Sequence, residues 1–110
     1  MRAKPMKQTA TGYEPCEPKE ATHVQLHMPG PLPFRILPVM IGGRRAGTPN
    51  WTWNGSTEAP TLKPSILSRG GPADAEIICH SFVNDGRVKF LADCSHSLAG
   101  QTVDLLEVEE

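Results

Sequence analysis

Prolines and glycines interrupt this chain so often that a long helix has no room to form. The sequence holds 11 prolines and 10 glycines among 110 residues, and no segment longer than about 10 residues carries apolar side chains at helical spacing. Short stretches instead alternate, as where Val24, Leu26 and Met28 stand between polar neighbours, which is typical of half-buried strands. We therefore predict an all-β fold, a small single-domain sandwich or partly open barrel with a central hairpin.

Length and composition favour one domain with a modest core. Only 38% of the residues are hydrophobic, so the core is modest. A chain of 110 residues usually forms a single domain. Residues 1–21 carry prolines and charges without periodicity, so we predict a flexible N-terminal arm there and a single β domain over residues 22–110. Pro33 and Pro38 predict that the strand around them is irregular or lies at an edge.

Charge and hydropathy narrow the classes of function. A formal net charge of −1 argues against a general nucleic-acid-binding surface. No apolar run approaches the roughly 18 residues of a membrane span, and residues 1–20 lack the apolar segment of a signal peptide. We therefore expect a cytoplasmic protein without a membrane partner, in which three cysteines favour free thiols or metal binding over disulfides.

The stretch from Cys79 to His96 predicts the central β-hairpin, because Asn84-Asp85-Gly86 separates two apolar runs. A three-residue loop would pair Phe82 with Val88 and place both on the apolar face. A two-residue loop would pair Phe82 with Lys89 and mix apolar with charged side chains on one face. We therefore expect the three-residue loop, since a slip of one residue moves every side chain to the other face.

The open end of this hairpin gathers side chains that bind metals. Thiolate and imidazole are the usual zinc ligands, and Cys79, Cys94 and His96 are the best donors. Asp93 or His80 would complete a set of four, although Cys79 and its neighbour His80 can bind one ion only if the strand distorts. The sequence therefore predicts a Zn²⁺ site, which would also staple a thin core.

Two other interpretations of these side chains stay open. In the first, Cys79 is a buried thiol, His80 is hydrogen-bonded, and Asp93 and His96 cap turns. In the second, Cys79 is a nucleophile with His96 as its base and Asp93 as the orienting carboxylate, or zinc with an open position activates water. Because no known nucleophile loop surrounds Cys79, the sequence assigns no catalytic residue.

A second candidate site combines aromatic and cationic side chains. Trp51 and Trp53 face one side of a short strand, and Arg44 and Arg45 lie in a glycine-rich loop just before it. The indoles can stack on a base, and arginine can grip phosphate through two hydrogen bonds. This predicts a surface for a nucleotide or another anion, with core packing of the indoles and a solvated loop as the simpler alternatives.

Four motifs follow one another along the chain. Together they resemble a family of small uncharacterised proteins from phages, prophages and their bacterial hosts, over about residues 35–105. The resemblance implies a phage or prophage origin and a bacterial cytoplasm, but no established activity. An automatic ammonia monooxygenase label used for such proteins does not fit a short chain without a membrane span. The motifs are Trp51-x-Trp53-Asn54-Gly55, Pro60-Thr61-Leu62-x-Pro64-Ser65-Ile66, Cys79-His80-Ser81-Phe82 and Asp93-x-x-His96-x-Leu98-Ala99-Gly100-Gln101-Thr102-Val103.

These observations favour a non-enzymatic, zinc-stapled β module that binds a protein partner from the host or the phage. The alternative is a nucleotide- or anion-binding protein, or a zinc- or cysteine-dependent hydrolase that uses the same side chains. Nothing in the sequence predicts the oligomeric state.

Overall fold

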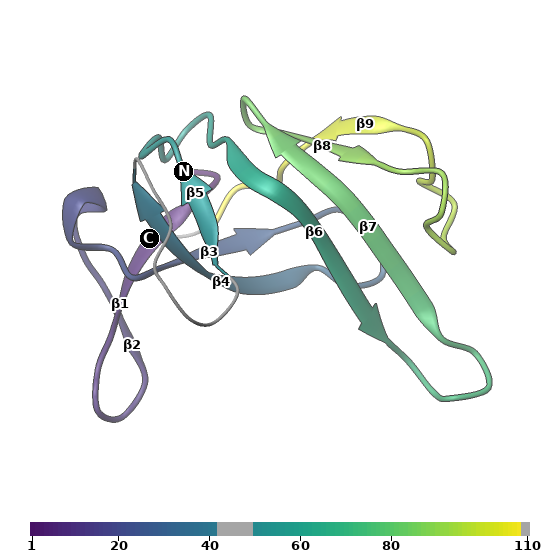
Figure 1. Cartoon of the computed structure of the whole chain (residues 1–110), viewed down its shortest axis with the longest axis horizontal. Helices are drawn as coiled ribbons and strands as arrows, with labels where there is room; N and C mark the ends of the chain where they lie inside the picture. The colour runs from purple at the N-terminus through teal and green to yellow at the C-terminus, as the bar shows by residue number, and fades with distance from the viewer. Residues whose placement is uncertain (42–49, 109–110) are drawn as a thin grey trace.

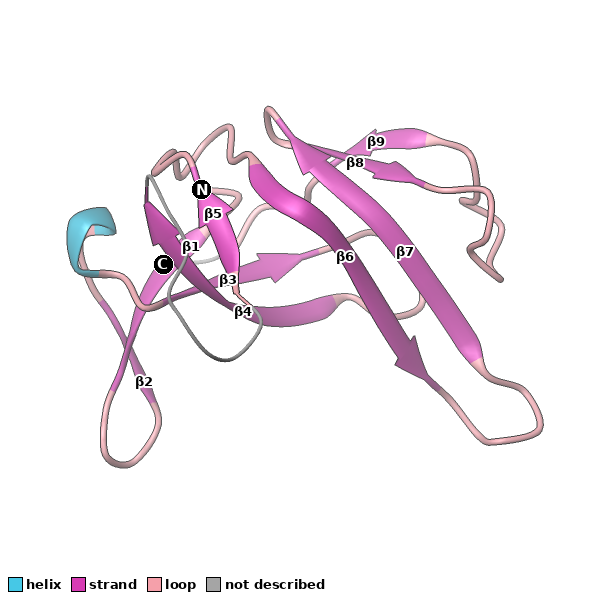
Figure 2. Cartoon of the chain, viewed as in Figure 1, coloured by secondary structure: helices cyan, strands magenta, loops and turns pink. Residues whose placement is uncertain are grey.

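Strand pairing organises the whole of the computed structural model, which describes residues 1–41 and 50–108. One open sheet has the strand order β2-β1-β3-β4-β5-β6-β7-β8-β9 (Figure 1), and among these described strands only β4 and β5 run parallel. Figure 2 shows a single short helical turn, η1, beside these strands. The all-β prediction is confirmed. The elements are β1 (Lys4–Gln8), β2 (Tyr13–Pro15), η1 (Pro18–Glu20), β3 (His23–His27), β4 (Phe34–Ile41), β5 (Trp51–Trp53), β6 (Leu62–Gly70), β7 (Ile77–Asn84), β8 (Arg87–Phe90) and β9 (Thr102–Asp104).

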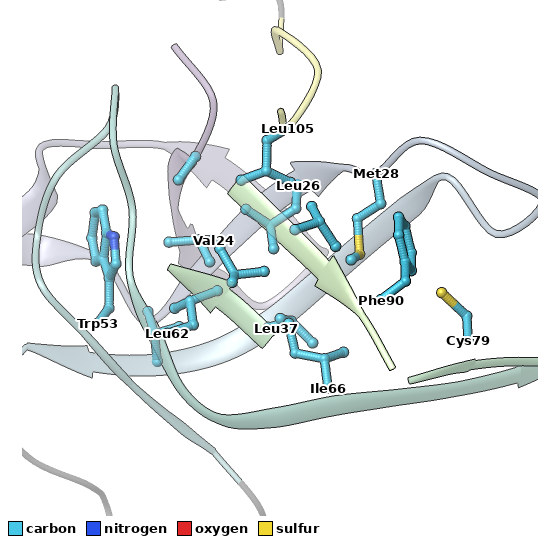
Figure 3. Packing of buried hydrophobic residues seen from close by; sticks show 14 of the residues in the cluster. Val24, Leu26, Met28, Leu37, Trp53, Leu62, Ile66, Cys79, Phe90 and Leu105 are labelled. Carbon is cyan, nitrogen blue, oxygen red and sulfur yellow. The ribbon is translucent and has the colours of Figure 1, made fainter. Parts of the chain in front are cut away.

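The sheet curls so that one of its faces encloses the hydrophobic core. The segment after β9 returns to β3, where the Leu106 N–H donates to the His27 carbonyl at 3.0 Å. Trp53 and Phe90 are the largest fully buried side chains. Figure 3 shows them around a cluster that includes Val24, Leu26, Met28, Leu37, Leu62, Ile66, Cys79 and Leu105.

Alternation along β3 explains its place in the core. Val24 and Leu26 are fully buried, whereas His23, Gln25 and His27 are half-buried, as the sequence pattern predicts. The neighbouring strand β4 is not at an edge, because it lies between β3 and β5. It pairs with β3 over residues 34–38 and with β5 over residues 39–41. Pro38 therefore stands where the strand changes partner, so its missing N–H interrupts neither ladder.

Residues 1–21 do not form the flexible arm that the sequence predicts. β1 adds to the free edge of β3, with Pro5 opposite Val24, and β2 adds to β1. Ala3 is fully buried and Met6 is nearly so. The few apolar residues of this segment thus suffice to dock it, because the edge of β3 supplies the backbone hydrogen bonds.

The hairpin between β7 and β8 has the two-residue loop, so the expected pairing of Phe82 with Val88 is wrong. Phe82 pairs with Lys89, and Asp85 and Gly86 have φ of 52° and 77°, as a primed hairpin turn requires. The expectation failed because it placed Phe82 inside, whereas this side chain is 44% exposed. Val88 and Phe90 face the core and are fully buried. Within the described residues, no helix combines the length and apolar character that crossing a membrane requires.

Candidate active site and metal centre

Ser65 and His80 meet where β6 pairs with β7. Leu67 lies opposite His80. Earlier in β6, however, the three residues 63–65 together lie opposite the single residue Phe82. This irregularity is a β-bulge, which bends a strand and re-aims its side chains. Ser65 Oγ consequently lies 3.1 Å from His80 Nε2, within hydrogen-bond distance.

Asp93 contacts the other nitrogen of the same imidazole. Its Oδ2 lies 2.9 Å from His80 Nδ1. The turn after β8 brings it there, since the Leu91 N–H donates to the His80 carbonyl at 2.9 Å. The side chains of Asp93 and His80 are 59% and 27% exposed, so the pair lies on the outer face of the sheet, within reach of solvent.

The three side chains form one series of hydrogen bonds with a fixed direction. A carboxylate only accepts hydrogen bonds, so the imidazole form that can act as a base directs its Nδ1 proton at Asp93. Nε2 is then unprotonated and accepts from the Ser65 hydroxyl. The Trp51 indole N–H donates to the Ser65 carbonyl at 3.2 Å and holds the backbone that carries this hydroxyl. Nucleophile, general base and orienting carboxylate stand in the order that activates a serine.

A second cluster lies on the inner face, behind His80 and Asp93. The donor atoms of Cys79, Cys94 and His96 all lie within 4.8 Å of one another, which is suitable for a metal ion. Both cysteines are buried. Two nearby polar atoms are buried without a hydrogen bond to any described residue: His96 Nε2 and the hydroxyl of Ser68, which pairs with Cys79 across the two strands. Such orphaned atoms are unusual in a core and call for a ligand or a water.

The protonation of Cys79 depends on what occupies this cluster. Burial, reinforced by the neighbouring Cys94, raises the pKa of the Cys79 thiol to about 11. A thiol in this state is a poor nucleophile at neutral pH. The raised pKa and the burial of Cys79 therefore disfavour it as the nucleophile of a hydrolase, whereas a bound cation would stabilise its thiolate. Cys16, Cys79 and Cys94 are all free of disulfides.

The backbone joins the two clusters. The Cys94 Sγ accepts a hydrogen bond from the His80 N–H at 3.2 Å and donates one to the His80 carbonyl at 3.1 Å. Cys79 precedes His80 in β7, and Asp93 precedes Cys94 after β8. As successive residues of a strand, Cys79 and His80 point to opposite faces, while burial separates Cys94 from the exposed Asp93. The inner cluster therefore holds the two chain segments that present His80 and Asp93 on the outer face.

The other predicted site residues are distributed differently from expectation. His80 and Asp93 do not complete the metal set, because they hydrogen-bond each other on the opposite face. Trp53 is fully buried in the core, and Trp51 is half-buried against Ser65. Arg44 and Arg45 lie outside the described residues.

No function was assigned to Ser65 from the sequence, although the motif that contains it, Pro64-Ser65-Ile66, was identified. Ser65 and His80 are 15 positions apart in the sequence, and no spacing rule links them. A usable signal would have been a hydroxyl and an imidazole on two adjacent antiparallel strands. Only the correct register, with its bulge, brings the two side chains together.

Comparison with known families gives one match. A protein-family model described as bacterial ubiquitination-like system serine protease (BubE) matches residues 35–91. Comparison with curated proteins gives no match, and comparison with solved structures gives none either. The matched residues include Ser65 and His80, whereas Asp93 lies just beyond them.

Proposed function

The chain belongs to the BubE family of bacterial ubiquitination-like system serine proteases, and we propose that it is a serine peptidase with Ser65 as its nucleophile. His80 is the general base and Asp93 the carboxylate that orients it. The observation that carries the proposal is the hydrogen-bonded series Ser65–His80–Asp93, at 3.1 and 2.9 Å. The family description supports a serine nucleophile, while the assignment of the three residues rests on their geometry.

The reaction follows from the direction of these hydrogen bonds. As Ser65 Oγ attacks the scissile carbonyl carbon, its proton passes to His80 Nε2, and the imidazolium is stabilised by Asp93. The tetrahedral intermediate collapses when the bond to the leaving amine breaks and Nε2 gives that amine the proton. A water, deprotonated by the same nitrogen, then attacks the acyl-enzyme and releases the carboxylic acid and free Ser65.

The family description suggests the kind of substrate. It places these serine proteases in a ubiquitination-like system, so we propose that the substrate is a protein of such a system. This gives the expected protein partner a specific role, since the partner would be bound as a substrate. The predicted host or phage origin of that partner remains part of the proposal.

An active-site-directed probe tests the nucleophile without knowledge of the substrate. A fluorophosphonate should add one phosphonyl group to the wild-type protein, and tandem mass spectrometry should locate it on Ser65. The Ser65→Ala variant should not react, whereas Ser97→Ala, at an exposed serine, should react at the wild-type rate. A lack of labelling, or labelling that persists in Ser65→Ala, would overturn the proposal.

We further propose that Cys79, Cys94 and His96 bind Zn²⁺ with a structural role. Two thiolates and an imidazole are preferred zinc ligands, and the donor atoms of these three residues lie within 4.8 Å of one another. Coordination by His96 would also give its orphaned Nε2 a partner, with the proton then on Nδ1 in place of the 3.3 Å contact from the Leu98 N–H. A metal ion on the buried face can stabilise the fold, whereas a substrate binds at the outer face.

Metal analysis tests this second proposal directly. Protein purified without chelators should carry about one zinc per chain in native mass spectrometry. Cys94→Ser should lose it, whereas Cys16→Ser, which changes a cysteine outside the cluster, should keep it. Metal-free wild-type protein that is as stable as the zinc-loaded form would refute a structural role.

A further inference from the structure

A pocket of about 930 Å³ lies over β6 and β7, the two strands that also carry Ser65 and His80. Its walls come from the ends of β6, β7, β8 and β9 around the Asp85-Gly86 turn, strands that run next to one another in Figure 1. Lys63 in this wall is two residues from Ser65, and Phe82 is two residues from His80. Since a strand advances about 3.3 Å per residue, the near edge lies ~7 Å along the strands from the proposed catalytic residues. An extended peptide covers that distance in about two residues.

The pocket carries an excess of positive charge. Its lining includes four cationic side chains, Arg2, Lys63, Arg87 and Lys89, and two carboxylates, Asp85 and Asp104, a net charge of +2. The chain as a whole carries −1, so the excess is local. It therefore needs an explanation at this site.

The four cations differ in whether they already make an ion pair or hydrogen bonds within the protein. Arg87 lies 3.5 Å from Asp104, and Arg2 donates to the carbonyls of Leu105 and Glu58. Lys63 and Lys89 are exposed and make no ion pair or hydrogen bond with any residue that the structure describes. The two free ammonium groups thus belong to the residues that lie opposite Phe82 on its two neighbouring strands.

Phe82 adds an apolar surface between these charges. It pairs with Lys89 across the hairpin and lies opposite the β-bulge that carries Lys63. Its side chain is 44% exposed, so the face of the ring is available to a ligand. An apolar side chain of a bound peptide can cover this ring while neighbouring carboxylates reach the lysines.

We infer that the pocket receives an acidic segment of the protein substrate, adjacent to the scissile bond, with an apolar residue against Phe82. The inference rests on the proposed peptidase function, because the distance of the pocket from Ser65 is what makes it a substrate subsite. Lys63 and Lys89 are specificity-determining residues in this assignment. A protein substrate is favoured over a nucleic acid because, among the described lining residues, only Lys63 and Lys89 are cations without an ion pair or a hydrogen bond, while the exposed ring between them suits a side chain.

Binding of matched peptides to the Ser65→Ala protein tests the inference apart from catalysis. The probes are two fluorescent peptides, Gly-Glu-Leu-Glu-Gly and Gly-Gln-Leu-Gln-Gly, which differ only in charge. We expect the glutamate peptide to bind at least about 10-fold more tightly at low salt, and the difference to shrink as salt is added. Adding Lys63→Glu and Lys89→Glu should abolish the preference, whereas Lys19→Glu on η1 should retain it. The melting temperature of each variant checks that it is folded.

The outcomes separate this inference from the proposed function. If wild-type Ser65 reacts with the fluorophosphonate but the two peptides bind equally or not at all, the acidic subsite is wrong and the peptidase assignment stands. If Ser65 fails to react, the peptidase assignment fails and the subsite falls with it. A short oligothymidylate that displaces the glutamate peptide at lower concentration than unlabelled peptide does would overturn the choice of a protein ligand.

Discussion

Replacing Asp93 by asparagine should slow the reaction of Ser65 with a fluorophosphonate about 30-fold. The carboxylate and the imidazolium that forms during attack are in contact, with Oδ2 2.9 Å from Nδ1. Two unit charges with centres ~4 Å apart attract each other by about 1 kcal/mol in water and about 4 kcal/mol at a protein surface of intermediate dielectric. Because Asp93 is 59% exposed, we take about 2 kcal/mol, which corresponds to the 30-fold factor.

The assay is the second-order rate constant of labelling, followed by intact mass. It should be measured for the wild type, for Asp93→Asn and for Asp74→Asn, which removes an exposed carboxylate from the loop between β6 and β7. We expect Asp74→Asn to match the wild type. High salt should narrow the gap between wild type and Asp93→Asn, because exposed charges are screened.

Two results would refute this reasoning. A change of less than about twofold would mean that Asp93 does not support the imidazolium. A loss beyond about 1000-fold would exceed what an exposed ion pair can supply and would mean that the base had changed tautomer or that the site had lost its structure. Urea unfolding of the variant separates the last two explanations.

Four further outcomes follow from the fold and the inner cluster. Chelation, or Cys79→Ser, should lower both the melting temperature and the labelling rate of Ser65, and an unchanged labelling rate would contradict the coupling of the two clusters. Removing residues 1–8 should destabilise the domain in urea, since β1 is docked on β3; equal stability would restore the flexible arm. Phe90→Ala should cost about 3–5 kcal/mol in the same assay, because the ring is fully buried. In metal-free native protein at pH 8, iodoacetamide should modify the half-buried Cys16 before the buried Cys79, whose pKa near 11 keeps it protonated; mass spectrometry showing the reverse order would contradict the assignment.

The strands were predictable because their apolar residues alternate. The alternation around Val24 and Leu26 and the turn residues Asp85-Gly86 locate β3 and the hairpin from local physics alone. The register of that hairpin was not predictable by the same rule. Phe82 is apolar yet faces outward, so counting apolar residues on each face selected the wrong pairing.

The two clusters differ in how much of each was visible in the sequence. Cys94 and His96 share one turn, and the hairpin brings Cys79 to them, so short spacing and chemistry indicated this group. Ser65 belongs to another strand, and its approach to His80 depends on a bulge that no local pattern specifies. The docking of residues 1–8 likewise depends on a free edge elsewhere in the sheet.

The order Cys79-His80 within β7 has a consequence for how this protein can change. One residue of the pair faces inward and the next outward, so deleting a single residue between His80 and the turn at Asp85-Gly86 would exchange the faces they occupy. The imidazole would be buried in the core and the thiol would be exposed to solvent, while Asp93 and Ser65 would remain on the outer face without a general base. Point substitutions can adjust either side of the sheet separately, but insertions and deletions in β7 must act on both sides at once. Length variation should therefore collect in the loop between β6 and β7, where a change in chain length leaves the alternation intact.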